Sequence, residues 1–61
     1  MDNTPVIEKV DSPTGKYWWR IRASNGEILS NSELYSSQRS RERTVVKLAS
    51  LTGWAVTQSA D

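Results

Sequence analysis

The fold of this 61-residue chain is decided by residues 16–29, whose sequence is KYWWRIRASNGEIL. The first half of this stretch alternates with a period of two, which is the repeat of a β-strand. On this pattern one face carries Tyr17, Trp19, Ile21 and Ala23, and the other carries Trp18, Arg20 and Arg22. The pair Asn25-Gly26 follows and predicts a type I′ turn, because both central residues of that turn need a positive φ. The stretch therefore predicts a β-hairpin.

The predicted turn also sets the register of the hairpin. A two-residue turn places Ala23 opposite Ile28 and Arg22 opposite Leu29. Ile28 would then join the face of the first set of side chains, and Leu29 would join the second. The returning strand is expected over about residues 27–32.

A further strand is expected before the hairpin, over about residues 6–11. Its sequence begins with VIEKV, which is rich in β-branched residues, and it ends at the turn signal SPTG of residues 12–15. Glu8 and Lys9 would be charges that discourage further pairing, as found on the edge strands of sheets.

A helix is expected after the hairpin, from residue 38 to residue 51 or 52. Ser37 offers a side-chain oxygen to the first free amides of the helix, and Gly53 is suited to end it. The apolar spacing is helical, and the residues expected to meet the sheet are Val45, Leu48 and Leu51.

These elements predict an α+β fold in which a three-stranded antiparallel sheet packs on one C-terminal α-helix (β-β-β-α). We expect a single small domain over residues 1–61, with an ordered core of about residues 5–56 and a loose polar tail at residues 57–61. One helix covers only one face of a sheet. The face that carries Trp18, Arg20, Arg22 and Leu29 is therefore expected to stay open.

The hairpin and the residues after it resemble the YegP-like family, short domains of unknown function. The resemblance rests on an aromatic–Arg strand, an Ala-x-Asn-Gly-Glu hairpin at residues 23–27, the pair Ser32-Glu33 and a helix start at Tyr35 and Ser37. It covers about residues 6–51, and Arg41 and Thr44 stand where the family more often has Ala and Gly. The resemblance implies the β-β-β-α fold. Because family members often occur as tandem copies, it also implies a homodimer for a single copy, and it implies no activity.

The composition excludes several kinds of chemistry. The chain has no Cys and no His, and its eight basic and seven acidic residues give a net charge of +1. It therefore lacks a thiolate, a disulfide, a histidine base and the usual zinc ligands. We expect no enzyme, no cofactor and no metal. The sequence shows neither a long apolar run nor the pattern of a signal peptide, so a cytoplasmic protein is expected.

The open face is the main candidate binding site. Trp and Arg are enriched at the hot spots of interfaces, and an arginine stacked on an indole adds cation–π attraction. The predicted partner-binding residues are Trp18, Arg20, Arg22 and Leu29. One alternative is a solvated face on which arginine stems cover the indole. Another is a tail that folds back, so that Trp54 or Val56 covers the face.

A second candidate is the basic row Arg39, Arg41, Arg43 and Lys47. Basic residues near the start of a helix oppose its macrodipole, and like charges four residues apart repel. Their presence favours a contact with an anion or a phosphate. The alternative is ordinary solubilising charge, whose energies are screened by salt.

Two functions follow from these surfaces. The first is a non-catalytic interaction module, homodimeric, that binds a protein partner through the open sheet face. A chain this short buries only about 60% of its unfolded surface, which favours a second copy. The alternative is nucleic-acid binding through the Trp/Arg face, since a sheet can enter a major groove. No membrane partner and no small-molecule substrate are expected.

Overall fold

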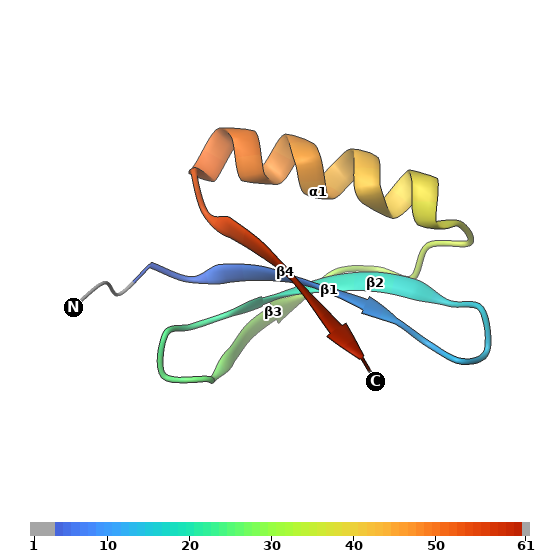
Figure 1. The fold of residues 1–61 in the computed structure, drawn as a ribbon, viewed down its shortest axis with the longest axis horizontal. Helices are drawn as coiled ribbons and strands as arrows, with labels where there is room; N and C mark the ends of the chain where they lie inside the picture. Colours follow the sequence, from blue (N-terminus) through green and yellow to red (C-terminus); the bar gives the residue numbers. More distant parts are fainter. Residues whose placement is uncertain (1–3, 61) are drawn as a thin grey trace.

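The computed structural model describes residues 4–60 and shows a four-stranded sheet with one helix packed on it (Figure 1). In chain order the elements are β1 (Val6–Asp11), β2 (Tyr17–Arg22), β3 (Ile28–Asn31), α1 (Gln38–Thr52) and β4 (Ala55–Ala60). The strand order in the sheet is β3-β2-β1-β4. The α+β class and the helix on a sheet are confirmed.

The fourth strand corrects the prediction of three antiparallel strands. Residues 55–60, expected to be an apolar end and a loose tail, run parallel to β1, and all six lie opposite its six residues. The sheet is therefore mixed. It also follows that β1 lies inside the sheet, so the prediction that Glu8 and Lys9 protect an edge strand was wrong.

The turn of the hairpin differs from the predicted type I′ turn. Gly26 has a φ of 92°, but among the described residues only glycines have a positive φ, so Asn25 does not. The Gly26 N–H donates to the carbonyl oxygen of Ala23 at 2.9 Å. This is the pattern of a three-residue loop, in which a type I turn is followed by a left-handed glycine.

The longer loop changes the register between β2 and β3. Ile28 lies opposite Arg22 and Ser30 lies opposite Ile21, with a bulge between the two pairs. Leu29 is the extra residue of this bulge. Ile28 therefore shares the face of Arg22, and not the helix face on which it was expected.

The ends of α1 are confirmed as predicted. The Ser37 side chain accepts a hydrogen bond from the N–H of Ser40, and its backbone is extended, as an N-cap requires. Gly53 ends the helix in the left-handed conformation, with a φ of 77°. The chain then turns directly into β4, which runs beneath the helix and beside β1 (Figure 1).

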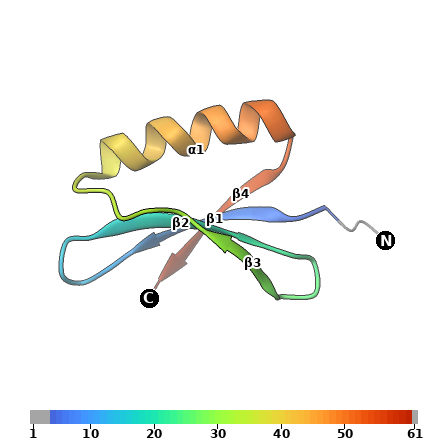
Figure 2. The same ribbon diagram turned by 180° about the vertical axis from the view of Figure 1, so that it is seen from behind.

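The core of the molecule is thin. Among the described residues, the buried apolar side chains are Ile7, Val10 and Val45, and Arg41 is buried with them. Leu51 was expected to meet the sheet but is exposed, because it lies at the side of the helix that faces solvent. Figure 2 shows that α1 covers one side of the sheet while the other side carries no element.

Candidate binding surfaces

The open face of the sheet carries the side chains that the alternation of β2 predicts. Tyr17 lies on the helix side, since the guanidinium carbon of Arg41 in α1 is 5.5 Å from the centroid of its ring. Successive side chains of a strand point to opposite faces. Trp18, Arg20 and Arg22 therefore lie on the side away from α1.

Glu8 of β1 lies in the middle of this open face, directly opposite Arg20. Its Oε1 accepts hydrogen bonds from Nε of Arg20 and, at 2.9 Å, from Nη2 of Arg22. Arg22 Nη1 also donates to the carbonyl oxygen of Gly26 at 2.7 Å. These bonds hold the three charged side chains in one arrangement, in which two positive charges exceed one negative charge.

The pKa of Glu8 reflects these neighbours. Its partial burial would raise the pKa, but the hydrogen bonds and positive charges of Arg20 and Arg22 outweigh this effect and lower the pKa below its ordinary value. Glu8 is therefore ionised at neutral pH. Sequence reasoning missed this role, and the signal that identifies it is the register of β1 against β2.

Arg20 retains hydrogen-bonding capacity toward the solvent side. Its Nε donates a hydrogen bond to Glu8, whereas its two terminal nitrogens have no hydrogen-bond partner among residues 4–60. The Arg20 side chain is 19% exposed. Such a planar pair of donors fits a carboxylate or a phosphate. Trp18, two residues earlier on the same face of β2, is half-buried.

The alternative in which a folded-back tail covers this face is contradicted by the structure. Val56 lies in β4 opposite Ile7, on the helix side of the sheet, and Trp54 is half-buried where α1 turns into β4. At the β3 end of the open face, Ile28 and Leu29 are both exposed. The open face thus combines an arginine with free donors, a half-buried indole and exposed apolar side chains.

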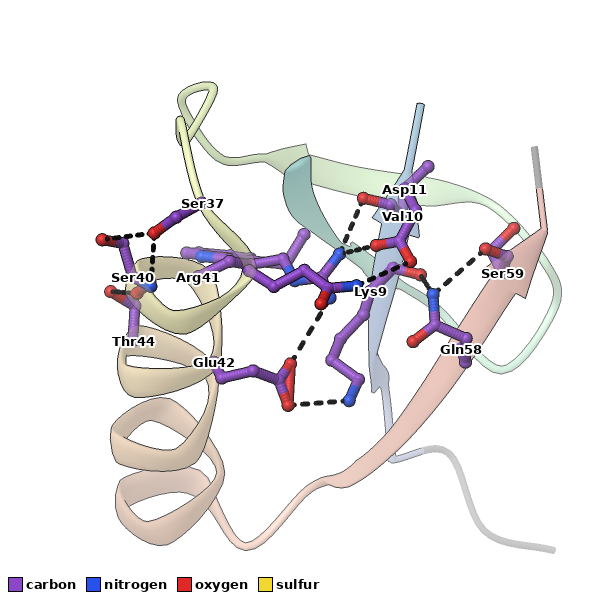
Figure 3. Close-up of polar contacts among 12 residues, drawn as sticks. Lys9, Val10, Asp11, Ser37, Ser40, Arg41, Glu42, Thr44, Gln58 and Ser59 are labelled. Carbon is purple, nitrogen blue, oxygen red and sulfur yellow. Dashed lines mark hydrogen bonds and ion pairs between the residues drawn. The ribbon is translucent and has the colours of Figure 1, made fainter. Parts of the chain in front are cut away.

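Arg41 belongs to the interior and not to the basic row in which it was expected. Its side chain is only 2% exposed, and its Nη1 donates to the carbonyl oxygen of Val10 at 2.9 Å and to the carboxylate of Asp11 (Figure 3). This corrects its assignment as an anion contact. The reason is its position four residues before Val45, on the side of α1 that faces the sheet.

The contacts of Arg41 extend into a small polar network between α1 and the sheet. Its Nη2 lies 3.5 Å from the carboxylate of Glu42, whose other oxygen lies 3.0 Å from Nζ of Lys9 (Figure 3). The hydrogen bond from Arg41 holds the pKa of Asp11 below its ordinary value, despite the opposing effect of partial burial. The network ties the helix to β1.

The rest of the basic row is exposed. Arg39, Arg43 and Lys47 lie on the outer surface of α1. Because α1 packs on one side of the sheet, this row and the open face lie on opposite sides of the molecule (Figure 1). The structure thus brings together Trp18, Arg20 and Arg22 but separates them from the helical cations.

Two other kinds of site were sought in the part of the chain that the structure describes. Residues 4–60 hold no cluster of three or more acidic, histidine or cysteine side chains suited to a metal ion. Over the same residues, no helix has the length and apolar character needed to cross a membrane.

A family model described as a domain of unknown function, DUF1508, matches residues 13–48, which is more than half of the chain. The chain belongs to this family. It is the family of the YegP-like domains that the hairpin residues resemble. The DUF1508 match includes β2, β3 and most of α1, whereas β1 and β4 lie outside it. No curated protein and no solved structure gives a significant match.

Proposed function

We propose that this chain is a small, non-catalytic interaction module that binds a protein partner through the open face of its sheet, and that it acts as a homodimer. The observation that carries the binding proposal is Arg20, which lies on the uncovered face beside Trp18 and whose terminal nitrogens have no hydrogen-bond partner within residues 4–60. A partner that fits this surface presents a carboxylate next to an apolar side chain.

The surroundings of Arg20 support this choice of partner. Glu8 fixes the guanidinium through Nε and leaves the outer donors free, so the site is arranged before the partner arrives. Because the side chains of Arg20 and Glu8 are only 19% and 14% exposed, a carboxylate bound here would be partly shielded from water, which strengthens a charge-assisted hydrogen bond. The positive excess of the cluster is small, which suits one carboxylate better than a chain of phosphates.

Photocrosslinking in cells that naturally produce the protein tests the binding proposal. A photoreactive residue at Leu29, which is exposed beside the open face, is compared with one at Ser50, which is exposed on α1. We expect a defined protein adduct from position 29 alone. Arg20→Gln should abolish this adduct, whereas the matched change Arg39→Gln on the helix should leave it intact. Equal adducts from both positions, or none, would contradict the proposal.

Nucleic-acid binding is the second candidate, and the residue types on the open face favour it. Its support is weaker, because Glu8 offsets one arginine and the row of Arg39, Arg43 and Lys47 lies on the far side of the sheet. A duplex held against the sheet would not reach that row. A salt titration decides: phosphate contacts give affinity that falls steeply with salt, and no retention on DNA at about 50 mM salt would exclude this function.

A further inference from the structure

The open face of the sheet carries one row of polar side chains that crosses all four strands. Residues that lie opposite each other in neighbouring strands share a face and are about 5 Å apart. The register therefore aligns four side chains, which we call the central row: Asn31 in β3, Arg20 in β2, Glu8 in β1 and Thr57 in β4. We propose that the β3 half of this row binds the free C-terminus of a partner polypeptide. Arg20 would hold the terminal carboxylate, and Asn31 would hold the peptide group next to it. This inference rests on the proposed function and names the part of the partner that is bound.

Asn31 is the second group of the central row with free hydrogen-bonding capacity. Its side chain is exposed and has no hydrogen-bond partner within residues 4–60. An asparagine amide donates through its nitrogen and accepts through its oxygen, so it can pair with the N–H or the C=O of a peptide group. A ligand on the face of a sheet needs such a partner, because the backbone groups inside the sheet already pair with neighbouring strands. Asn31 therefore complements Arg20 in binding a polypeptide.

The charges of the central row favour a ligand with a single carboxylate. Arg20 and Arg22 carry two positive charges and Glu8 carries one negative charge, so one added carboxylate makes the cluster neutral. Glu8 is adjacent to Arg20 on the β1 side, where it would repel any further acidic group of the ligand. The β3 side, toward Asn31, is uncharged. The polypeptide is therefore expected to cross β3 and to end at Arg20.

The short distance between Arg20 and Asn31 favours a terminal carboxylate over the carboxylate of an aspartate or glutamate side chain. At a C-terminus a single carbon atom joins the carboxylate to the peptide nitrogen, so the two groups lie close together at a nearly fixed separation. A side-chain carboxylate is attached through additional methylene groups, whose rotations are lost on binding. Two polar groups on adjacent strands are thus better matched to a chain end.

Apolar side chains lie on both sides of the central row. Trp18 precedes Arg20 by two residues on the same face of β2 and is half-buried. Ile28 lies opposite Arg22, on the other side of the row, and is 37% exposed. An apolar side chain near the end of the ligand would contact one of these residues and remove apolar surface from water. The expected ligand is therefore a chain end that combines a free carboxylate with an apolar residue.

Titration of the whole, isotopically labelled chain with three small probes, followed by NMR, tests the inference. The probes are N-acetyl-alanyl-leucine, which has a free C-terminus, its C-terminal amide, and N-acetyl-aspartyl-leucine amide, whose carboxylate is on a side chain. We expect the first probe to shift the Arg20 Nε–H and Asn31 side-chain signals saturably at millimolar concentration. Each of the other two should bind about tenfold more weakly, because charge-assisted hydrogen bonds are lost or misplaced.

Two variants and a matched control connect this binding to the central row. Arg20→Gln should abolish the shifts caused by N-acetyl-alanyl-leucine. Asn31→Ala should weaken its binding by about threefold to tenfold, which is the usual effect of one neutral hydrogen bond. Ser30→Ala is the control, because Ser30 is also exposed on β3 but lies opposite Ile21, on the helix side. The same spectra show whether each variant is folded.

The outcomes separate this inference from the proposed function. If N-acetyl-aspartyl-leucine amide binds as tightly as N-acetyl-alanyl-leucine, or if Asn31→Ala binds as tightly as Ser30→Ala, recognition of a C-terminus is overturned. Failure of all three probes to bind overturns it as well. The Arg20-dependent crosslink from position 29 decides the proposed function independently of these titrations.

Discussion

Replacing Arg41 by alanine should destabilise the protein more than any other change of a charged residue in α1. The substitution removes a charge-assisted hydrogen bond to Asp11, which contributes about 1.5–3 kcal/mol. It also leaves the carbonyl oxygen of Val10 without its side-chain donor, at a cost of about 1–3 kcal/mol if that oxygen stays buried. Asp11 itself is 38% exposed and remains hydrated, so it adds little, and the two contributions together amount to about 2.5–6 kcal/mol.

This loss is large for a chain of this size. A domain of 61 residues is stable by about 3–9 kcal/mol in total. Arg41→Ala should therefore be partly or fully unfolded at room temperature. Arg41→Met keeps most of the packing volume over Tyr17 and should retain more stability, since apolar residues can replace buried charges at little cost.

Urea denaturation followed by tryptophan fluorescence and circular dichroism measures these differences. Arg43→Ala is the matched control, because Arg43 lies on the same helix but is exposed, and its change should stay within about 0.5 kcal/mol. A double-mutant cycle with Asp11→Asn isolates the pair, whose coupling should exceed about 0.5 kcal/mol. If Arg41→Ala matches Arg43→Ala in stability, the buried network does not hold the helix on the sheet.

Three further predictions follow from the geometry. Because the pKa of Glu8 is lowered in the folded state, its contribution to stability is present at neutral pH and lost as pH falls below about 4. Urea midpoints of Glu8→Gln should therefore depend less on pH than those of the parent, and an equal dependence would contradict this. Gly53→Ala should cost about 1–2 kcal/mol in thermal or urea unfolding, because a non-glycine residue would have to adopt a φ of 77°. A chain truncated after Trp54 loses β4 and should show no cooperative unfolding transition, and a retained transition would show that β4 is dispensable.

The features that sequence predicted correctly depend on local signals. The alternation of residues 17–22 defines β2, and Ser37 and Gly53 define the ends of α1 through backbone geometry within a few residues. The turn was placed correctly at Asn25-Gly26, but its type depends on one residue of loop length. The one additional loop residue places Ile28 on the open face, beside Arg22, and not on the helix face.

The features that sequence missed depend on contacts between distant residues. β4 has only two β-branched residues, and its strand conformation comes from pairing with β1, whose residues lie 49 positions earlier. Its intrinsic preference is weak, and strand propensity depends strongly on such neighbours. Arg41 was assigned by its charge, although its spacing to Val45 places it on the buried side of α1. The helical periodicity predicted the position of Arg41 better than its charge did. Burial of the guanidinium is possible because the carboxylate of Asp11 and the carbonyl oxygen of Val10 accept its hydrogen bonds.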